Sequence, residues 1–243
     1  MASRLWLIDA VAATVPADRF EALAGARGIH SIVANKLVST SGGSITWPIQ
    51  LVTDQAWPDA MDVGADQLHR MGVTGSGVAV AVVDSGIYFS PGMVLIDGQP
   101  DAIRYRGQAD FVGQGLCDTD SDPYEQLQYD GYCFRTYRSV DGYGHGSHVA
   151  GIIGNRCQDQ ATGVYLGIAP DASILSIRVL GDDGGGSYAD VIEGIQYVIA
   201  NKSLFGIRVM NLSLSAKATT PYFVDPLDRA VEKAWAAGLE RRH

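Results

Sequence analysis

The chain has 243 residues, of which 47% are hydrophobic, and its 27 acidic and 18 basic residues give a formal net charge of −9. A chain of this length and hydrophobicity can bury a substantial core, which excludes disorder for most of it. The acidic balance disfavours nucleic acid as a partner because phosphate binding needs a basic surface, and no uncharged apolar run reaches the about 18 residues that a membrane span requires.

Residues 1–45 predict a small α+β domain. Within it, residues 5–15 predict a strand, residues 16–28 a short helix and residues 29–38 a second strand. A unit of this size buries little surface alone, so we expect it to dock on a larger domain. Asp9 interrupts the apolar start of the chain, so the sequence shows no clear signal peptide.

A turn-rich stretch follows this small domain. Residues 39–58 hold small residues and prolines without sustained periodicity, and we place a linker at residues 46–60. Residues 61–243 then form the larger predicted domain.

Strands and helices alternate through this larger domain. A short helix over residues 64–72 precedes an unbroken apolar run over residues 77–86, which is typical of a parallel strand buried on both faces. Helices and strands then alternate over residues 144–154, 172–180, 188–204, 207–215 and 225–238. This alternation predicts an α/β fold, a parallel sheet with helices on both faces, with chemistry at the carboxyl ends of the strands.

The stretch from residue 107 to residue 143 is long, irregular and acidic. Five of its aspartates, Asp118, Asp120, Asp122, Asp130 and Asp141, lie around Cys117 and Cys133. These could bind structural calcium through their oxygens, but they lack the ordered spacing of an EF-hand, so a solvated surface loop is the stronger prediction. A disulfide between Cys117 and Cys133 and free thiols remain equally open, and Cys157 makes the cysteine count odd.

Two short motifs carry the chemistry. His145 stands between two glycines at the start of a predicted helix in DGYGHGSHVAGIIG, where the backbone can approach closely on both sides and the imidazole can face a cleft. His148 and Ala150 are predicted to pack this helix on the sheet. Asp84 follows the buried strand in VAVAVVDSGI, where alone it would suit an Asx turn or a cap. Aspartate, then histidine, then a later serine is one of the chain orders of catalytic triads.

Together with RVLGDDGGGSY and MNLSLS, these motifs resemble the subtilisin-like serine proteases, the subtilase family, over about residues 60–238. The resemblance implies that Asp84 orients and stabilises the imidazolium, while His145 is the general base toward a serine hydroxyl and the general acid toward the leaving amine. Ser147 replaces the threonine that is commoner in this motif.

The resemblance also implies partners and a location. By this resemblance a polypeptide is the expected substrate, and the protein is expected to be secreted. Residues 5–38 resemble an inhibitory propeptide, whose C-terminal tail would fill the substrate cleft of the zymogen until it is cleaved within the linker.

Seven residues match the two walls of the family's substrate cleft. One wall, a glycine loop that pairs with an extended peptide, matches Gly184, Gly185, Gly186 and Tyr188, and the facing strand matches Ser213, Leu214 and Ser215. Ser215 replaces a glycine of the family, which alters the expected shape of the primary pocket.

The family's serine motif, GTS-A-P, and the AAGN segment that supplies its oxyanion asparagine do not occur in these residues. After AWAAG, the polar residues LERRH are not expected to form the next buried strand. Ser85, Ser147 and Ser187 do not stand in a strand-to-helix turn, so none is predicted to be a nucleophile. The 243-residue chain as written is therefore predicted to be inactive.

Two other classes of function are weighed against an enzyme. The first is a binding module, either a pseudo-protease that keeps its peptide cleft or a prodomain that inhibits another protease. The second is a nucleotide-binding α/β protein, suggested by GDDGGGS. That loop lacks a Walker lysine and a G-x-G-x-x-G pattern, and its acidity opposes phosphate.

Overall fold

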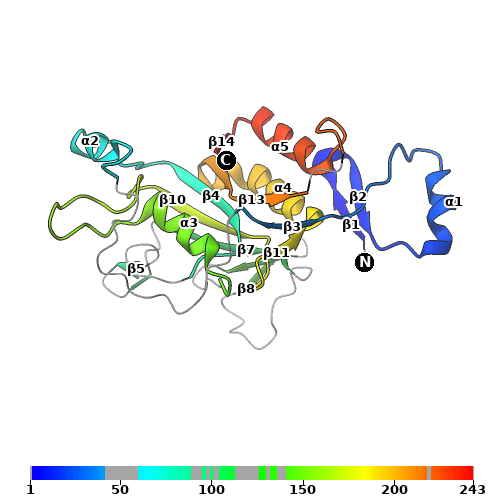
Figure 1. Ribbon diagram of the computed structural model, residues 1–243, viewed down its shortest axis with the longest axis horizontal. Helices are drawn as coiled ribbons and strands as arrows, with labels where there is room; N and C mark the ends of the chain where they lie inside the picture. The colour runs from blue at the N-terminus through cyan, green and yellow to red at the C-terminus, as the bar shows by residue number, and fades with distance from the viewer. Residues whose placement is uncertain are drawn as a thin grey trace.

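A computed structural model describes residues 2–41, 60–88, 95–96, 99–100, 104–112, 126–129, 132–135, 141–217 and 220–242 (Figure 1). Most of the predicted linker lies outside the described residues. The same holds for Asp118, Asp120, Asp122, Asp130, Cys117 and the side chain of Cys133. The predictions for calcium and for a disulfide therefore stay predictions, while Cys157 carries a free thiol.

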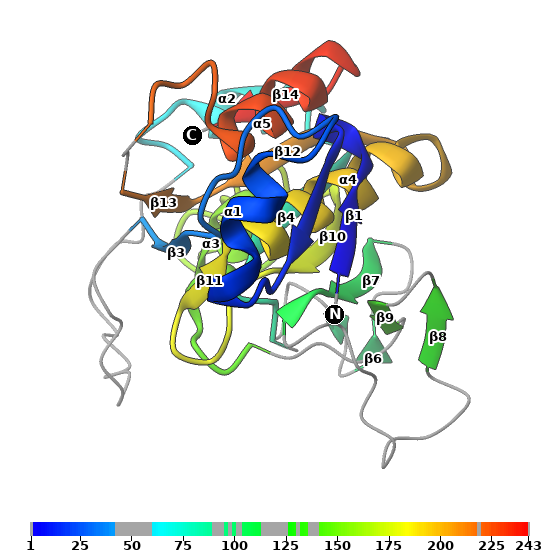
Figure 2. The ribbon, with the colours of Figure 1, turned by 90° about the vertical axis from the view of Figure 1, so that its right-hand side faces the viewer.

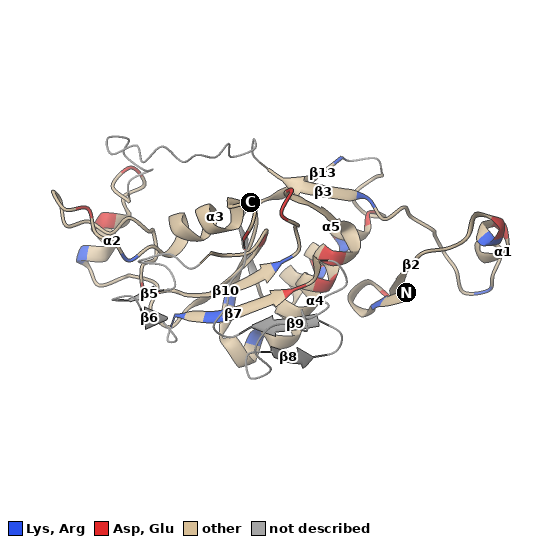
Figure 3. Cartoon of the chain, turned by 90° about the horizontal axis from the view of Figure 1, so that it is seen from below, with Lys and Arg blue, Asp and Glu red and all other residues tan. Residues whose placement is uncertain are grey.

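A seven-stranded sheet in the order β14-β12-β4-β10-β7-β9-β8 forms the centre of the molecule. Its strands are β4 (Ala79–Asp84), β7 (Tyr105–Asp110), β8 (Gln126–Tyr129), β9 (Tyr132–Arg135), β10 (Ser173–Arg178), β12 (Ile207–Leu212) and β14 (Glu240–Arg242). The strands from β14 to β7 pair in parallel, whereas β9 is antiparallel to both β7 and β8. Figure 3 shows that the charged residues of β7 and β10 lie toward the strand ends.

Helices cover both faces of this sheet because β4 is apolar on both. Val80 and Val82 belong to one core with Ala150 of α3 (His145–Gly154). Ala81 and Val83 belong to the other core, under α4 (Tyr188–Phe205) and α5 (Pro226–Ala236). The predicted α/β class, a parallel sheet with helices on both faces, is confirmed. Within the described residues, no helix combines the length and apolarity needed to cross a membrane.

The N-terminal residues dock on α4 and α5. A hairpin of β1 (Ala2–Leu5) and β2 (Ala10–Ala13), joined by the 3-10 helix η1 (Trp6–Ile8), buries Leu5 and Ile8 in the core shared with these helices. The next elements are η2 (Ala17–Arg19) and α1 (Phe20–Ala24), and α1 lies at the far end of the molecule in Figure 1.

The chain then returns as β3 (Leu37–Thr40), which lies between β11 (Gly185–Ser187) and β13 (Leu214–Ala216) in a second, three-stranded sheet (Figure 2). Both pairings are antiparallel. Two smaller elements complete the described structure, the short helix α2 (Ala65–Arg70) and the pair β5 (Leu95–Ile96) with β6 (Gln99–Pro100).

Several local predictions were wrong. The stretch predicted as one strand over residues 5–15 is a hairpin, because Asp9 takes a left-handed conformation with φ 53° and turns the chain. The second predicted strand begins only at Leu37, and its last residues reach into the stretch taken for a linker. His148 is exposed rather than packed on the sheet, while Ala150 is buried as predicted.

The end of the chain also differs from the prediction. Glu240–Arg242, expected to be too polar for a strand, pairs in parallel with Val209–Asn211 as β14 at the edge of the sheet. An edge strand needs backbone pairing but does not need apolar side chains on both faces, so a polar sequence can form it. Leu239, just before it, enters the core.

Candidate active site

Asp84 is the last residue of β4, at the carboxyl end of a central strand, and its side chain is fully buried. Its Oδ1 accepts a hydrogen bond of 2.7 Å from the backbone N–H of Ser85. Its carbonyl accepts from the backbone N–H groups of Val179 and Leu180, which follow β10. The carboxylate is therefore held by the turn after β4, and the backbone of Asp84 is anchored to the residues that follow β10.

His145 is the first residue of α3 and faces this carboxylate. Its Nδ1 lies 2.8 Å from Oδ1 and 2.9 Å from Oδ2 of Asp84. The hydrogen bond to Asp84 raises the pKa of His145 above its ordinary value, against the opposing effect of burial, and the charge of Asp141 adds to the rise. With Nδ1 turned to the carboxylate, Nε2 lies on the opposite side of the ring, where a base can serve a substrate or nucleophile.

The glycines beside His145 permit this approach. Gly144, the N-cap of α3, has a φ of 90°, a conformation that favours glycine. A Cβ on Gly146 would lie 2.1 Å from the carbonyl oxygen of Gly86 and 3.1 Å from the Cβ of Asp84. The helix start can therefore meet the turn after β4 only with glycine at residue 146, which is the physical reason for the motif.

Asp141 ties these two segments together, a role that its place in an acidic stretch did not indicate. Its Oδ1 accepts hydrogen bonds of 2.8 Å from the Ser85 hydroxyl and from the Gly144 N–H. Its Oδ2 accepts from the N–H of Ser147 at 2.8 Å and from the Ser147 hydroxyl at 2.5 Å. The signal available in the sequence was its position four residues before His145, just ahead of a helix start.

Arg178 supports the same turn from β10. Its Nε donates to the carbonyl of Ser85 at 3.2 Å, and its two Nη atoms donate to Asp110 at 2.8 Å and to Asp182 at 2.9 Å. Sequence reasoning missed this network because Ser85 and Asp110 lie far from Arg178 along the chain.

The glycine loop predicted as a cleft wall lies next to the segment that precedes His145. Gly184 has a φ of 76° and packs against the ring of Tyr143, so that a Cβ there would lie 2.6 Å from the ring. Gly185 and Gly186 form β11 with Ser187. Tyr188 begins α4 immediately after this strand.

The residues predicted to form the facing wall lie in and beside the strand β13. Leu214 and Ser215 pair with Thr40 and Ser39 of β3, and the carbonyl of Ser213 accepts a hydrogen bond of 3.1 Å from the N–H of Ser41. The structure thus brings the two predicted walls to opposite edges of one strand of the same chain.

Side chains of β3 alternate between these walls and solvent. Val38 and Thr40 are buried, whereas Leu37 is 83% exposed. Such alternation is expected of an extended segment with one face against the protein.

Three serines close to these motifs are occupied by structural hydrogen bonds. The Ser85 and Ser147 hydroxyls both donate to Asp141. The Ser187 hydroxyl caps α4 in a reciprocal capping box with Asp190. In the part of the chain that the structure describes, no group of three or more His, Cys, Asp or Glu side chains could hold a metal ion.

Comparison with known proteins points to one family. The family model for the subtilase family matches residues 75–240. Serine protease AprX of Bacillus subtilis (strain 168) is 36% identical over 172 residues, which are 69% of this chain and 32% of that protein.

Two further relatives come from the same organism. Subtilisin E is 35% identical over 182 residues, 73% of this chain and 38% of that protein. Minor extracellular protease Vpr is 30% identical over 210 residues, 85% of this chain and 23% of that protein. The chain therefore spans less than two fifths of the length of each of these three relatives.

Proposed function

Because the chain belongs to the subtilase family, we propose that Asp84 and His145 are two members of the Asp-His-Ser triad of a serine endopeptidase. The observation that carries this proposal is the contact of His145 Nδ1 with both oxygens of the buried Asp84, at 2.8 and 2.9 Å. A carboxylate in this position holds the imidazole in the tautomer whose Nε2 can accept a proton.

In the proposed reaction, Nε2 of His145 takes the proton of a serine hydroxyl as the hydroxyl attacks the peptide carbonyl. The imidazolium that forms is stabilised by Asp84, and it then gives its proton to the leaving amine. Water releases the acyl group by the same steps. The serine would come from outside residues 1–243, since those near the site are engaged elsewhere.

The proposed substrate is a polypeptide bound in extended form between β11 and β13. The pairing of β3 with both strands supports this, since it uses the backbone edges that a substrate would use. The path of β11 itself requires glycine at residue 186, because a Cβ there would lie 2.4 Å from the carbonyl oxygen of Val179.

Residues 1–45 are proposed to be an inhibitory propeptide. Two features support this: the hairpin buries Leu5 and Ile8 against α4 and α5, and β3 fills the proposed cleft. Cleavage in the linker at residues 46–60 would then convert the zymogen to the open enzyme. Secretion is proposed from the relatives, one of which is named an extracellular protease.

The test measures peptide hydrolysis by the protein that is encoded by the longest reading frame containing these 243 residues. We expect activity that a serine-directed inhibitor abolishes, and a loss of about 10⁴-fold in kcat for Asp84→Asn and about 10⁶-fold for His145→Ala. Asp159→Asn, a change in an exposed turn, is the control that should leave activity unchanged. Full activity in the His145→Ala variant would overturn the proposal.

The 243-residue chain by itself is proposed to give no hydrolysis, and a second function follows for it. With the hairpin docked and the cleft filled, it resembles a binding module as much as an enzyme. Adding the chain to an active subtilisin-type protease separates the two: tight, stoichiometric inhibition supports an inhibitory module, and unchanged turnover supports a protease fragment.

A further inference from the structure

A lysine of the N-terminal segment is seated in an acidic pocket beside the proposed cleft. Nζ of Lys36 lies 2.7 Å from Oδ2 of Asp225 and 3.0 Å from Oγ1 of Thr220. It also lies 5.0 Å from the centre of the Tyr188 ring, within reach of a cation–π contact. The lysine and aspartate side chains are only 13% and 5% exposed, so this ion pair is largely shielded from solvent.

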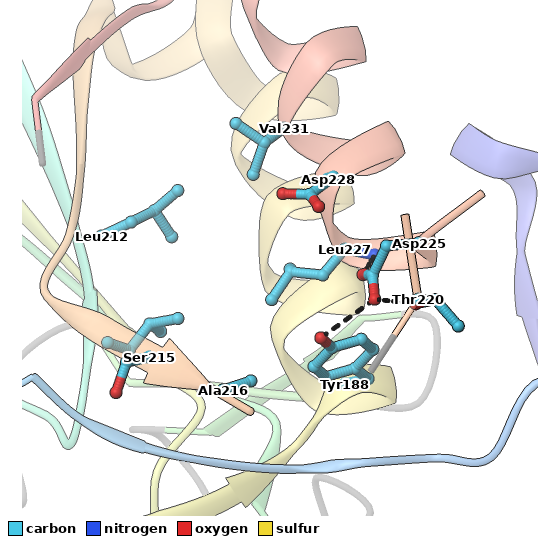
Figure 4. A pocket seen from close by; sticks show the side chains of 10 residues that line it. Tyr188, Leu212, Ser215, Ala216, Thr220, Asp225, Leu227, Asp228 and Val231 are labelled. Carbon is cyan, nitrogen blue, oxygen red and sulfur yellow. Dashed lines mark hydrogen bonds between the residues drawn. The ribbon is translucent and has the colours of Figure 1, made fainter. Parts of the chain in front are cut away.

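The two oxygens of Asp225 have different tasks. Oδ1 accepts the N–H of Leu227 at 3.0 Å and caps α5. Oδ2 accepts from Lys36, from the Thr220 hydroxyl at 2.8 Å and from the Tyr188 hydroxyl at 3.3 Å, as Figure 4 shows for the last two. The helix cap accounts for the hydrogen bond of Oδ1 alone. Oδ2 accepts its hydrogen bonds from a cation and two hydroxyl groups, as a cation-binding carboxylate would.

The lysine is essential to the electrostatic balance of this pocket. A buried carboxylate that loses its counter-ion is strongly destabilised. Burial would raise the pKa of Asp225, but hydrogen bonds from Lys36 and Thr220 hold it below its ordinary value. The hydrogen bond to Asp225 in turn raises the pKa of Lys36. Every pocket residue but the lysine lies beyond residue 187, so the cation is supplied by a separate, extended segment.

Backbone contacts fix which position of an extended chain enters the pocket. The N–H of Tyr188 donates to the carbonyl of Lys36 at 3.0 Å, and the pairing of Val38 with Gly186 sets the register after it. Lys36 and Val38 are two residues apart, so both side chains point to the protein while Leu37 between them faces solvent. Any chain bound in this register would present the same position to Asp225.

A cavity next to the ion pair leaves space for a larger cation. It has a volume of about 210 Å³, and apolar side chains, among them Leu212, Leu227 and Val231, line it together with Asp225 (Figure 4). An apolar wall ending at a carboxylate suits a long side chain with a charged end, such as lysine or arginine.

We propose that the pocket around Asp225 is a specificity site that binds a lysine or arginine side chain of an extended polypeptide lying between β11 and β13, and that Lys36 occupies it in this structure. The inference rests on the proposed role of these strands as the substrate cleft. It adds to the proposed cleft a preference among bound polypeptides. The preferred polypeptide has a basic residue two positions before the residue that takes the place of Val38.

The first test uses the full chain and hydrogen–deuterium exchange of the amides of residues 38–41. Lys36→Met is expected to raise the exchange rate of these amides at least about tenfold over the parent chain, because the charge pair loses a partner. Lys36→Arg keeps the positive charge, so its exchange rate should stay within about threefold of the parent rate. Leu37→Met, at the exposed neighbour, is the matched control and should change nothing. Equal exchange in the Lys36→Met variant and the parent would overturn the proposal.

Asp225→Asn tests the receptor side. Asparagine also caps helices, so α5 keeps its start. In this background the exchange rate should no longer depend on whether residue 36 is lysine or methionine. If the exchange rate still differed between lysine and methionine at residue 36 as much as in the parent, Asp225 would not be the group that recognises the lysine charge.

The second test supplies the segment in trans. In the Lys36→Glu chain, whose own segment is repelled, a labelled peptide with the sequence of Asn35–Ser41 is compared with the same peptide carrying methionine in place of the lysine. The lysine peptide is expected to bind at least about tenfold more tightly, and the difference should vanish when Asp225→Asn is added.

The outcomes of this second test distinguish the two proposals. Equal binding of both peptides would overturn the specificity site while supporting the cleft. Binding of neither peptide to a chain that still unfolds cooperatively would overturn the cleft, and the specificity site with it.

Discussion

The contact between His145 and Asp84 decides which nitrogen of the imidazole exchanges protons. Nδ1 is held within 2.9 Å of both carboxylate oxygens, so proton exchange with a partner is left to Nε2. Because the raised pKa of His145 has the hydrogen bond to Asp84 as its largest cause, the pair makes a direct prediction about titration.

Asp84→Asn is expected to lower the pKa of His145 below that of the parent chain, because the remaining burial favours the neutral ring. A pKa raised by folding stabilises the fold at pH values below about 6.5, the ordinary histidine value, and this contribution is lost as the pH rises through the raised value. NMR titration of the His145 ring in both chains measures the change. An unaltered pKa would mean that Asp84 does not carry the effect.

Gly146 and Gly151 provide a matched pair in one helix. Gly146→Ala forces a Cβ to within 2.1 Å of the Gly86 carbonyl oxygen, so it is expected to lower the free energy of unfolding by at least about 2 kcal/mol. Gly151→Ala meets no atom within 4 Å and is expected to stabilise the helix by up to about 1 kcal/mol. Denaturant unfolding measures both, and equal effects would contradict the close approach.

At the scale of elements, Asp141 joins the end of β4 to the start of α3. Asp141→Ala removes the acceptor of four hydrogen bonds, and we expect it to cost about 2–4 kcal/mol of stability. It should also lower the pKa of His145, since the charge of Asp141 raises it. Asp141→Asn keeps the volume and one acceptor oxygen but turns an NH2 group toward the other donors, so it should recover only part of the stability. Full recovery would mean that the side chain acts through its volume alone.

The elements that the sequence predicted well are those with a local signal. The strand β4 is an unbroken apolar run, and α4 begins at a capping box and ends before Gly206. Elements set by distant partners could not be predicted. β14 forms because the edge of β12 accepts it, and β3 forms between two strands that lie more than a hundred residues further along the chain.

The candidate site divides in the same way. Asp84 and His145 stand in motifs whose residues are neighbours in sequence, so their types and order were informative. Arg178, Lys36 and Asp225 make contacts with residues of distant segments, and no local pattern distinguishes them from other charged residues. Their roles required the three-dimensional arrangement.

At the scale of the whole molecule, the N-terminal hairpin and the larger domain share one core. Leu5 and Ile8 lie in the same cluster as residues of β4, α4 and α5. The hairpin backbone is also bound: the N–H of Leu7 donates to Gln196 at 3.0 Å, and Arg229 donates to the carbonyl of Ile8 at 3.2 Å. Removing buried surface at this contact should therefore lower the stability of the whole molecule, not only that of the hairpin.

Ile8→Ala is expected to lower the free energy of unfolding by about 2–4 kcal/mol, because it leaves a cavity against α5. Val11→Ala, at a position that is 66% exposed on the same hairpin, is the control and should change stability by less than about 0.5 kcal/mol. Thermal unfolding compares them. An Ile8→Ala effect as small as that of Val11→Ala would mean that the hairpin is not part of the cooperative unit.

The position of β3 has a consequence for solubility. Both β11 and β13 have strand edges that β3 covers at the same time. Uncovered edges are templates for pairing between molecules, which leads to aggregation. We therefore expect β3 to prevent association of the chain with its own copies. If β3 is withdrawn, the edges of β11 and β13 should both become able to pair with other molecules until another extended chain covers them.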